Sequence, residues 1–101
     1  MYVYLIQSLE NGYYKIGKSK NPNKRIEQLQ TGNSSKLKLI STYQSELSNK
    51  IEGTLHRKYS YLKKEGEWFD LSIREEIVFQ EECKKIEENI LILKKNDNSF
   101  I

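Results

Sequence analysis

The alternation of apolar and polar residues at the start of the chain predicts two paired β-strands. Tyr2 to Ser8 is a run of aromatic, β-branched and aliphatic residues, and a second short strand is expected from Tyr13 to Gly17. The dipeptide Asn11-Gly12 separates them and favours a tight hairpin turn, because both residues tolerate a positive φ. The two strands are therefore expected to pair antiparallel, with Tyr4 and Lys15 on the same face.

Two helices and a third strand are predicted after the hairpin. Asn21 is a good N-cap and Pro22 a favourable first helical residue, so a helix is expected from Pro22 to Gln30. A third strand is expected from Leu37 to Tyr43, where apolar residues alternate. Ser45 can cap a second helix that continues to about Lys63, with apolar residues at helical spacing: Leu47, Ile51, Leu55 and Leu62.

The last third of the chain predicts a short extended segment and a long helix. In the segment from Glu67 to Leu71, Trp68 and Phe69 are expected to cover one end of the core, with base stacking by Trp68 as the alternative. Ser72 and Glu75 match a capping box at the start of the final helix. A narrow apolar seam of this helix is expected to pack on the domain or on a second copy of the chain: Phe79, Cys83, Ile86, Ile90 and Leu93.

This order of elements predicts an α+β fold, a small three-stranded antiparallel sheet flanked by helices, with a long C-terminal helix. Residues 1–71 are expected to form the core, and residues 72–101 the C-terminal helix and a short polar tail that frays from Asn96. A chain of 101 residues has room for one domain with a modest core and none for a separate substrate domain.

Composition narrows the class of protein. Charged residues make up 31% of the chain and no segment is long and apolar enough to span a bilayer, so no membrane partner is expected. The short apolar N-terminus has no basic leader, which predicts an intracellular protein, cytoplasmic or in the nucleoid or nucleus. Cys83 is the single cysteine, which excludes an internal disulfide framework and predicts a buried apolar role. The net charge of +3 permits a polyanion partner without requiring one.

A candidate anion site lies where the second predicted strand gives way to the first predicted helix. The strand is expected to stop at Gly17, a lysine-rich loop with Lys18 follows, and Arg25 stands in the first turn of the helix. Backbone amides and side-chain cations can meet one phosphate there from several directions. The alternative is an ordinary strand-to-helix connection whose lysines are solvated.

Residues 1–71 resemble the GIY-YIG nuclease superfamily. The first family motif corresponds to Tyr2-Val3-Tyr4 and the second to Lys15-Ile16-Gly17, and the family arginine and glutamate fall on Arg25 and Glu52. Lys15 stands where the eponymous motif has a tyrosine. The chain is more similar to a branch, of the phage and virus type, that has lysine there and also carries the patterns Ile51-Glu52-x-x-Leu55-His56 and Glu67-Trp68-Phe69.

This resemblance implies a metal-dependent endonuclease that hydrolyses DNA phosphodiester bonds with one metal ion. Tyr4 would be the general base, and the ammonium of Lys15 would favour its phenolate form by Coulomb attraction. Arg25 would bind the scissile phosphate through two parallel hydrogen bonds. Glu52 would hold Mg²⁺ or Mn²⁺, with water and phosphate oxygens as the other ligands.

Two further residues belong to the candidate set. Lys18 is a candidate phosphate contact, with a solvated lysine as the alternative. His56, four residues after Glu52, is a candidate metal ligand, proton shuttle or phosphate contact. A lone histidine beside an apolar stripe is more often structural, so His56 carries less weight than Glu52.

Two other functions fit the same pattern. A nucleic-acid-binding module of this fold without catalytic turnover is favoured by Lys15 at the tyrosine position. A protein-interaction adaptor that forms a homodimer through the C-terminal helix is favoured by the narrow apolar seam.

Overall fold

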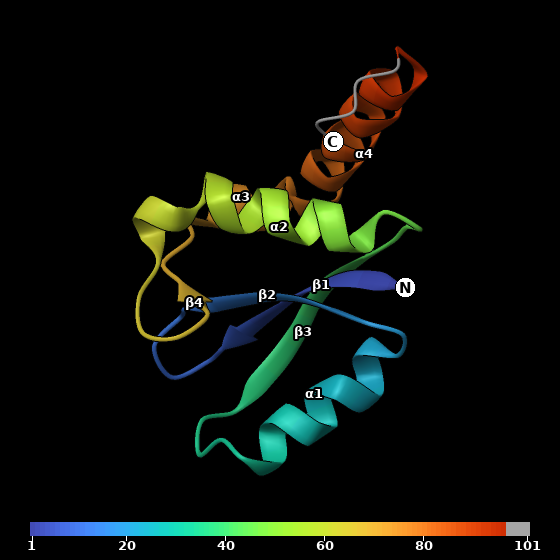
Figure 1. Cartoon of the computed structure of the whole chain (residues 1–101). Coiled ribbons are helices and arrows are strands. Elements are labelled where there is room, and N and C mark those ends of the chain that lie inside the picture. The colour runs from blue at the N-terminus through green and yellow to red at the C-terminus, as the bar shows by residue number, and fades with distance from the viewer. Residues whose placement is uncertain (97–101) are drawn as a thin grey trace.

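A computed structural model describes residues 1–96, which form one antiparallel sheet with helices on both faces (Figure 1). The strands are arranged in the order β3-β1-β2-β4 and comprise β1 (Tyr2–Ser8), β2 (Tyr14–Ser19), β3 (Leu37–Gln44) and the two-residue β4 (Trp68–Phe69). The α+β class is confirmed, but the sheet has four strands rather than three. The extended segment expected to cover the core also pairs with the edge of β2.

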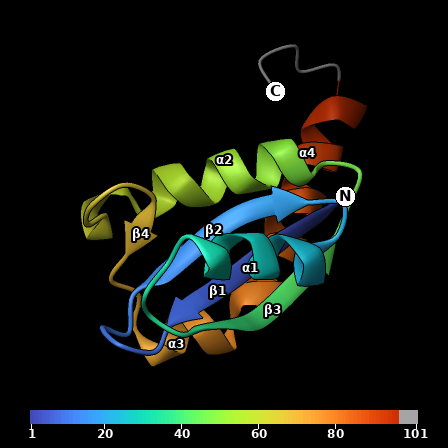
Figure 2. The same ribbon diagram turned by 90° about the horizontal axis from the view of Figure 1, so that it is seen from below.

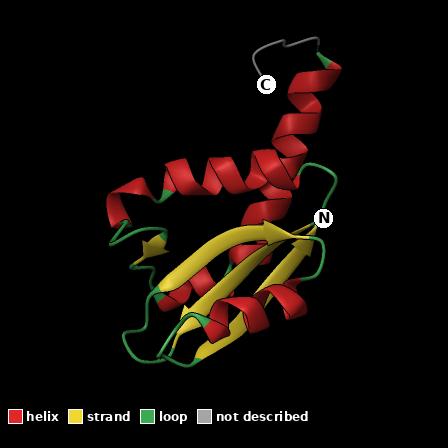
Figure 3. Ribbon diagram, turned by 60° about the horizontal axis from the view of Figure 1, so that its bottom comes forward, coloured by secondary structure: helices red, strands yellow, loops and turns green. Residues whose placement is uncertain are grey.

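The helices form a layer on each side of the sheet (Figure 3). α1 (Pro22–Thr31) covers one face, and a view from below shows it lying across that face (Figure 2). The opposite face carries α2 (Ser48–Lys58) and α4 (Phe79–Lys95). A 3-10 turn at Ser60–Leu62 and the short helix α3 (Ile73–Ile77) lie between them in the chain.

Two clusters of buried side chains fill the spaces between these layers. Side chains alternate along β1, so Val3 and Leu5 face α2 and α4, whereas Tyr4 and Ile6 face α1. The larger cluster, on the α2 side, contains Val3, Leu5, Tyr14, Ile16, Ile51, Leu55, Tyr59, Phe69, Leu71, Phe79, Cys83, Ile86 and Ile90. The smaller cluster, on the α1 side, contains Tyr4, Ile6 and Leu37, with Ile26, Leu29, Leu39 and Trp68 packed against it.

The register of the hairpin agrees with the prediction from the sequence. Gly12 has a φ of 78°, a left-handed conformation that suits glycine, in the turn between β1 and β2. Tyr4 pairs with Gly17 and Ile6 with Lys15, so Tyr4 and Lys15 share the face toward α1. β2 continues to Ser19, beyond the expected end at Gly17. Lys18 therefore lies in a strand opposite Val3 and not in a loop.

The second helix is shorter at both ends than predicted. It begins at Ser48 and ends at Lys58, where the 3-10 turn replaces its expected last turn. Ser45 does not cap it. Its hydroxyl oxygen accepts a hydrogen bond of 2.9 Å from the backbone N–H of Leu47 and also bonds to the Glu87 carboxylate, so Ser45 stabilises the turn before the helix.

The final helix begins after Ser72, as predicted, but is interrupted at Val78. The Ser72 hydroxyl bonds to the Glu75 carboxylate and not to the helix backbone, so the capping box is incomplete. The interruption separates the exposed Ile77 from the buried Phe79. It allows the apolar seam of α4 to turn toward the core.

The seam of α4 packs on the domain through its first four apolar positions, which belong to the larger cluster: Phe79, Cys83, Ile86 and Ile90. Leu93 is 42% exposed, and the end of α4 projects from the body of the molecule (Figure 1). Dimerisation through this helix stays a prediction. Most of the tail expected to fray lies at residues 97–101, outside the described residues. None of the helices within residues 1–96 combines the length and apolar character needed to cross a membrane.

Candidate active site

Tyr4 and Gly17 form the closest contact across the β1–β2 pair on the α1 side. A Cβ on residue 17 would lie 2.3 Å from the phenolic oxygen of Tyr4 and 2.4 Å from its Cζ. Only a residue without a side chain leaves room for the phenol, which explains a glycine inside a strand, where it is otherwise unfavourable. The Tyr4 side chain therefore extends from the inner strand β1 across β2, toward the outer edge of the sheet.

That outer edge of β2 is only partly covered by another strand. β4 pairs with Tyr14 and Lys15 alone, so no strand of the described part of the chain lies beside the edge from Ile16 to Ser19. The ring and the hydroxyl of Tyr4 lie against Gly17, which belongs to this uncovered segment. A phosphate group could approach the same segment without displacing a strand.

Lys15 is held by β4. Its ammonium lies 2.7 Å from Oε2 of Glu67 and 5.7 Å from the centre of the Trp68 ring. The hydrogen bond and charge of Lys15 lower the pKa of Glu67, so this carboxyl is ionised at neutral pH. Lys15 and Tyr4 occupy diagonal positions of the strand pair, which lie about 7–8 Å apart. The positive charge of Lys15 therefore acts on Tyr4 from a diagonal position. The carboxylate of Glu67 partly neutralises this charge.

His56 holds the uncovered edge from the α2 side. Its Nε2 lies 2.8 Å from the carbonyl oxygen of Ile16. A carbonyl can only accept, so Nε2 carries a proton and donates it. The ring also stands edge-on to Phe69, with 5.1 Å between ring centres and 88° between planes. His56 is thus fixed one residue away from Gly17.

Glu52 lies one turn before His56 on the same face of α2 and is partly exposed. The C-terminal end of α2 lies near β4, and β4 pairs with the Tyr14 end of β2. Glu52 lies about 6 Å from His56 toward the N-terminal end of α2, and therefore toward the Ser19 end of β2. Lys18 is exposed on the same side of the sheet, opposite Val3. Glu52 and Lys18 therefore flank the uncovered edge on the α2 side.

Arg25 lies on the other side of the sheet, in the helix that follows this end of β2. Lys20 and Asn21 alone join Ser19 to α1, and the Asn21 side chain accepts a hydrogen bond of 3.2 Å from the Lys24 N–H. Arg25 is exposed near the start of α1, and its guanidinium contacts Gln28 at 3.4 Å. Within residues 1–96 this weak contact is the one polar contact of the guanidinium, which can therefore bind an anion.

The sequence-predicted residues thus come from both faces of the sheet. Tyr4, Lys15 and Arg25 lie on the α1 side, whereas Lys18, Glu52 and His56 lie on the α2 side. Tyr4 and His56 both contact β2, at Gly17 and Ile16. A family model described as the T5orf172 domain matches residues 1–88. The chain belongs to the T5orf172 domain family. No curated protein and no solved structure matches the chain.

The T5orf172 domain is associated with nucleases, so the family supports a role in nuclease action or DNA binding. The matched region extends past residue 71 and includes α3 and part of α4. This agrees with the packing of α4 in the core shared with β1 and α2.

Tyr14 does not replace the tyrosine missing from the second motif. It lies on the α2 side, 3% exposed, and its hydroxyl donates a hydrogen bond of 2.6 Å to Glu76. Burial and then the Glu76 carboxylate raise the pKa of Tyr14 above its ordinary value. Tyr14 is therefore a structural residue of this T5orf172 domain.

Sequence reasoning missed the role of Glu67 beside Lys15. It assigned the segment Glu67-Trp68-Phe69 to the core, but only Phe69 is fully buried, and the Glu67 side chain is 63% exposed. Gly66, with a φ of 61°, turns the chain just before this segment. A glycine followed within three residues by two consecutive aromatic residues was the available signal for a short edge strand.

Proposed function

We propose that this T5orf172 domain is a metal-dependent endonuclease of the GIY-YIG type that hydrolyses DNA phosphodiester bonds at the uncovered edge of β2. The observation that carries the proposal is the contact between Tyr4 and Gly17, which packs the buried phenol against the backbone of β2 beside the uncovered part of its edge. The family association with nucleases and the net charge of +3 support it.

In this proposal, the chain supplies a base and cations to a phosphodiester. Tyr4 is the proposed general base for the attacking water, and the Lys15 ammonium lies on the same face at a diagonal position. Arg25 donates two parallel hydrogen bonds to the scissile phosphate and opposes the charge that develops there. Lys18 adds a second phosphate contact.

Glu52 is the proposed ligand of Mg²⁺ or Mn²⁺. Among residues 1–96, no group of three or more histidine, cysteine, aspartate and glutamate side chains is placed to hold a metal. A hard cation that keeps several waters and takes phosphate oxygens needs only one or two protein carboxylates, whereas zinc requires three or four protein ligands. When bound, the cation would neutralise charge on the phosphoryl oxygens.

His56 acts in this proposal as a positioning residue. Its Nε2–H is donated to Ile16, so this nitrogen is not available as a metal ligand. By holding the carbonyl of Ile16, His56 fixes the strand next to Gly17 and hence the surface that the Tyr4 phenol crosses.

The decisive experiment is cleavage of supercoiled plasmid, single-stranded DNA and branched DNA by the purified chain with Mg²⁺, Mn²⁺ or EDTA. Arg25→Ala and Glu52→Gln should abolish metal-dependent cutting. The matched controls are Arg74→Ala and Glu88→Gln, which change an exposed arginine of α3 and an exposed glutamate of α4. Full cutting by either site variant would overturn the proposal.

A nucleic-acid-binding module without turnover is the second candidate. The ion pair of Lys15 with Glu67 favours it, because the cation at the tyrosine position is already partly neutralised. It predicts DNA binding that weakens steeply with salt and that Mg²⁺ or Mn²⁺ does not convert into cutting on any of the substrates.

A further inference from the structure

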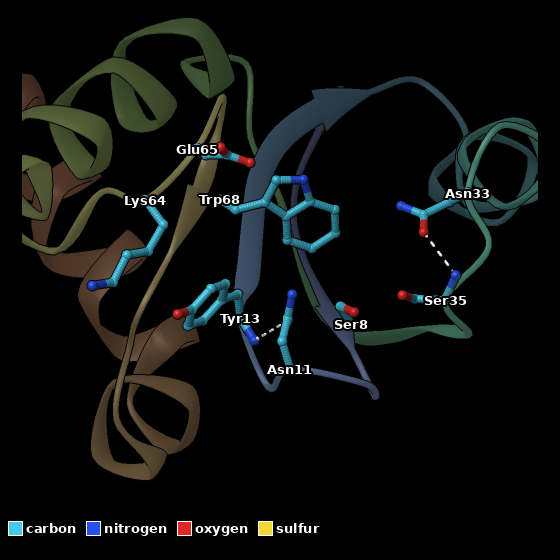
Figure 4. Close-up of a pocket in the computed structure, with 8 residues that line it drawn as sticks. All are labelled: Ser8, Asn11, Tyr13, Asn33, Ser35, Lys64, Glu65 and Trp68. Atoms are coloured by element: carbon cyan, nitrogen blue, oxygen red, sulfur yellow. Dashed lines mark hydrogen bonds between the residues drawn. The ribbon is translucent and has the colours of Figure 1, made fainter.

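A hollow on the α1 side of the sheet lies next to the proposed site and has no role in it. Its volume is 590 Å³, within the range of small-molecule sites. Three segments far apart in the chain line it: the β1–β2 hairpin, the α1–β3 loop and the segment that leads into β4. Its lining residues are Ser8, Asn11, Tyr13, Asn33, Ser35, Lys64, Glu65 and Trp68, all drawn in Figure 4.

The indole of Trp68 stands in the middle of this hollow (Figure 4). Trp68 pairs with Lys15, so it shares the face of the sheet that carries Lys15 and Tyr4. The indole is only partly buried and packs against the smaller cluster, while the Lys15 ammonium lies 5.7 Å from its ring centre. A flat ring that is fixed by packing and still accessible can stack with another flat ring.

Two asparagines direct hydrogen-bond donors toward the same space. The side-chain oxygen of Asn11 accepts from the Tyr13 N–H, and that of Asn33 accepts from the Ser35 N–H, both at 2.9 Å. These bonds fix which end of each amide is the oxygen, so each NH₂ group must point the other way. In Figure 4, both NH₂ groups point toward Trp68. The hollow therefore offers an aromatic surface with donors around it.

We propose that this hollow binds an unpaired nucleobase of the DNA strand, stacked on Trp68 and recognised through its oxo groups by Asn11 and Asn33. Thymine and guanine present such acceptors. Stacking on an aromatic side chain requires a base outside a duplex, so the preferred substrate is single-stranded or contains an unpaired base near the cut. The assignment rests on the proposed function, because that function brings a DNA strand to the adjacent Tyr4 and Arg25.

The position of Lys15 supports continuity between the two sites. Lys15 stands between Trp68 and Gly17. Trp68 is its partner on β4, and Gly17 lies about 7 Å from Lys15, two residues further along β2. A DNA strand whose phosphate binds at Gly17 can thus place a neighbouring base over Trp68. Lys15 then faces the sugar-phosphate backbone between the phosphate and the base.

Trp68 is the only tryptophan of the chain, so its fluorescence reports on the hollow directly. The test is to titrate the protein in EDTA with a short oligothymidylate and with an abasic oligomer of equal length and charge. Quenching by oligothymidylate and none by the abasic oligomer is expected. Equal quenching by both, or quenching by neither, would overturn the proposal.

Binding measured by anisotropy of a labelled oligothymidylate tests the individual residues. Trp68→Leu should weaken binding by at least about fivefold, because stacking on one aromatic side chain contributes that much or more. Asn33→Asp retains the acceptor for the Ser35 N–H but removes the donor and should also weaken binding. Asn89→Asp, on the exposed side of α4, adds the same charge elsewhere and should not. Unchanged binding by Trp68→Leu would overturn the base pocket.

The two proposals fail in different ways. Metal-dependent cutting without base-dependent quenching would leave the nuclease in place and remove the base pocket. Base-dependent quenching without cutting would retain the pocket and favour the binding module over the nuclease.

Discussion

Tyr4 crosses Gly17 so closely that any side chain at residue 17 would collide with the phenol. The phenolic oxygen would lie 2.3 Å from a Cβ at this position, a distance that real Cβ contacts do not reach. The ring of Tyr4 and the backbone of β2 are therefore fitted to each other, and the position of the hydroxyl depends on the missing side chain.

Gly17→Ala should displace the Tyr4 ring and abolish cleavage. The collision involves the rigid ring at Cζ as well as the hydroxyl, so β2 or the ring must move, at an expected cost of about 1–3 kcal/mol in the free energy of unfolding. Urea unfolding and plasmid cleavage measure the two effects. Gly32→Ala is the control, because a Cβ there meets nothing within 4 Å and both properties should be retained. Wild-type cleavage by Gly17→Ala would show that the phenol is not needed in this position.

Tyr4→Phe should lower cleavage and leave stability unchanged, whereas Tyr14→Phe should lower stability and leave cleavage unchanged. Removal of the Tyr4 hydroxyl eliminates the proposed base and should lower the cleavage rate by about 10²–10⁴-fold with little change in stability. Removal of the Tyr14 hydroxyl breaks its hydrogen bond to Glu76 and should cost about 1 kcal/mol of stability while cleavage is retained. Single-turnover cleavage and urea unfolding of both variants provide the comparison. If both variants cleave equally well, Tyr4 is not the base.

Local pattern was enough to predict most of the fold. Asn11-Gly12 and the period-two alternation around Tyr4 and Lys15 act within one hairpin, so strand pairing and the shared face follow from neighbouring residues. Asn21 and Pro22 likewise determine where α1 begins. Helix ends were less accurate, because the last turn of α2 gives way to a 3-10 turn where the chain must reverse toward β4.

The environment of the candidate site depends on contacts that no local pattern contains. Glu67 meets Lys15 across 52 positions of the chain, and His56 meets the carbonyl of Ile16 across 40. The first contact requires β4 to close on the edge of β2, and the second requires α2 to pack across β2. Motifs could therefore name candidate residues, whereas they could not name the partner of Lys15.

Glu67→Gln should change stability in a pH-dependent way. The bond to Lys15 lowers the pKa of Glu67 below its ordinary value of 4.5, so the unfolded chain binds its proton more readily than the folded one. The pair therefore stabilises the protein above that value, and its contribution is lost as the pH falls through the lowered pKa. Because Glu67 is 63% exposed, the effect at neutral pH should be under about 1 kcal/mol.

Urea unfolding of wild type and Glu67→Gln between pH 7 and pH 3 tests this expectation. Their difference in unfolding free energy should shrink toward zero at the acidic end. Glu88→Gln, an exposed glutamate on α4, serves as the control and should show no such convergence. A difference that grows as the pH falls would contradict the ion pair with Lys15.

The Cys83 thiol should be unreactive in the folded protein. It is 0% exposed within the larger cluster, and burial, followed by the charge of Glu82, raises the pKa of its thiol to about 12. Alkylation requires an accessible thiolate, and both conditions fail in the native state. Iodoacetamide at pH 8, followed by mass spectrometry, should therefore leave the native chain unmodified and label it once in urea. Asn89→Cys places a thiol on the exposed side of the same helix and should be labelled rapidly under native conditions. Equal native rates for Cys83 and the added thiol would mean that α4 does not stay packed against β1 and α2.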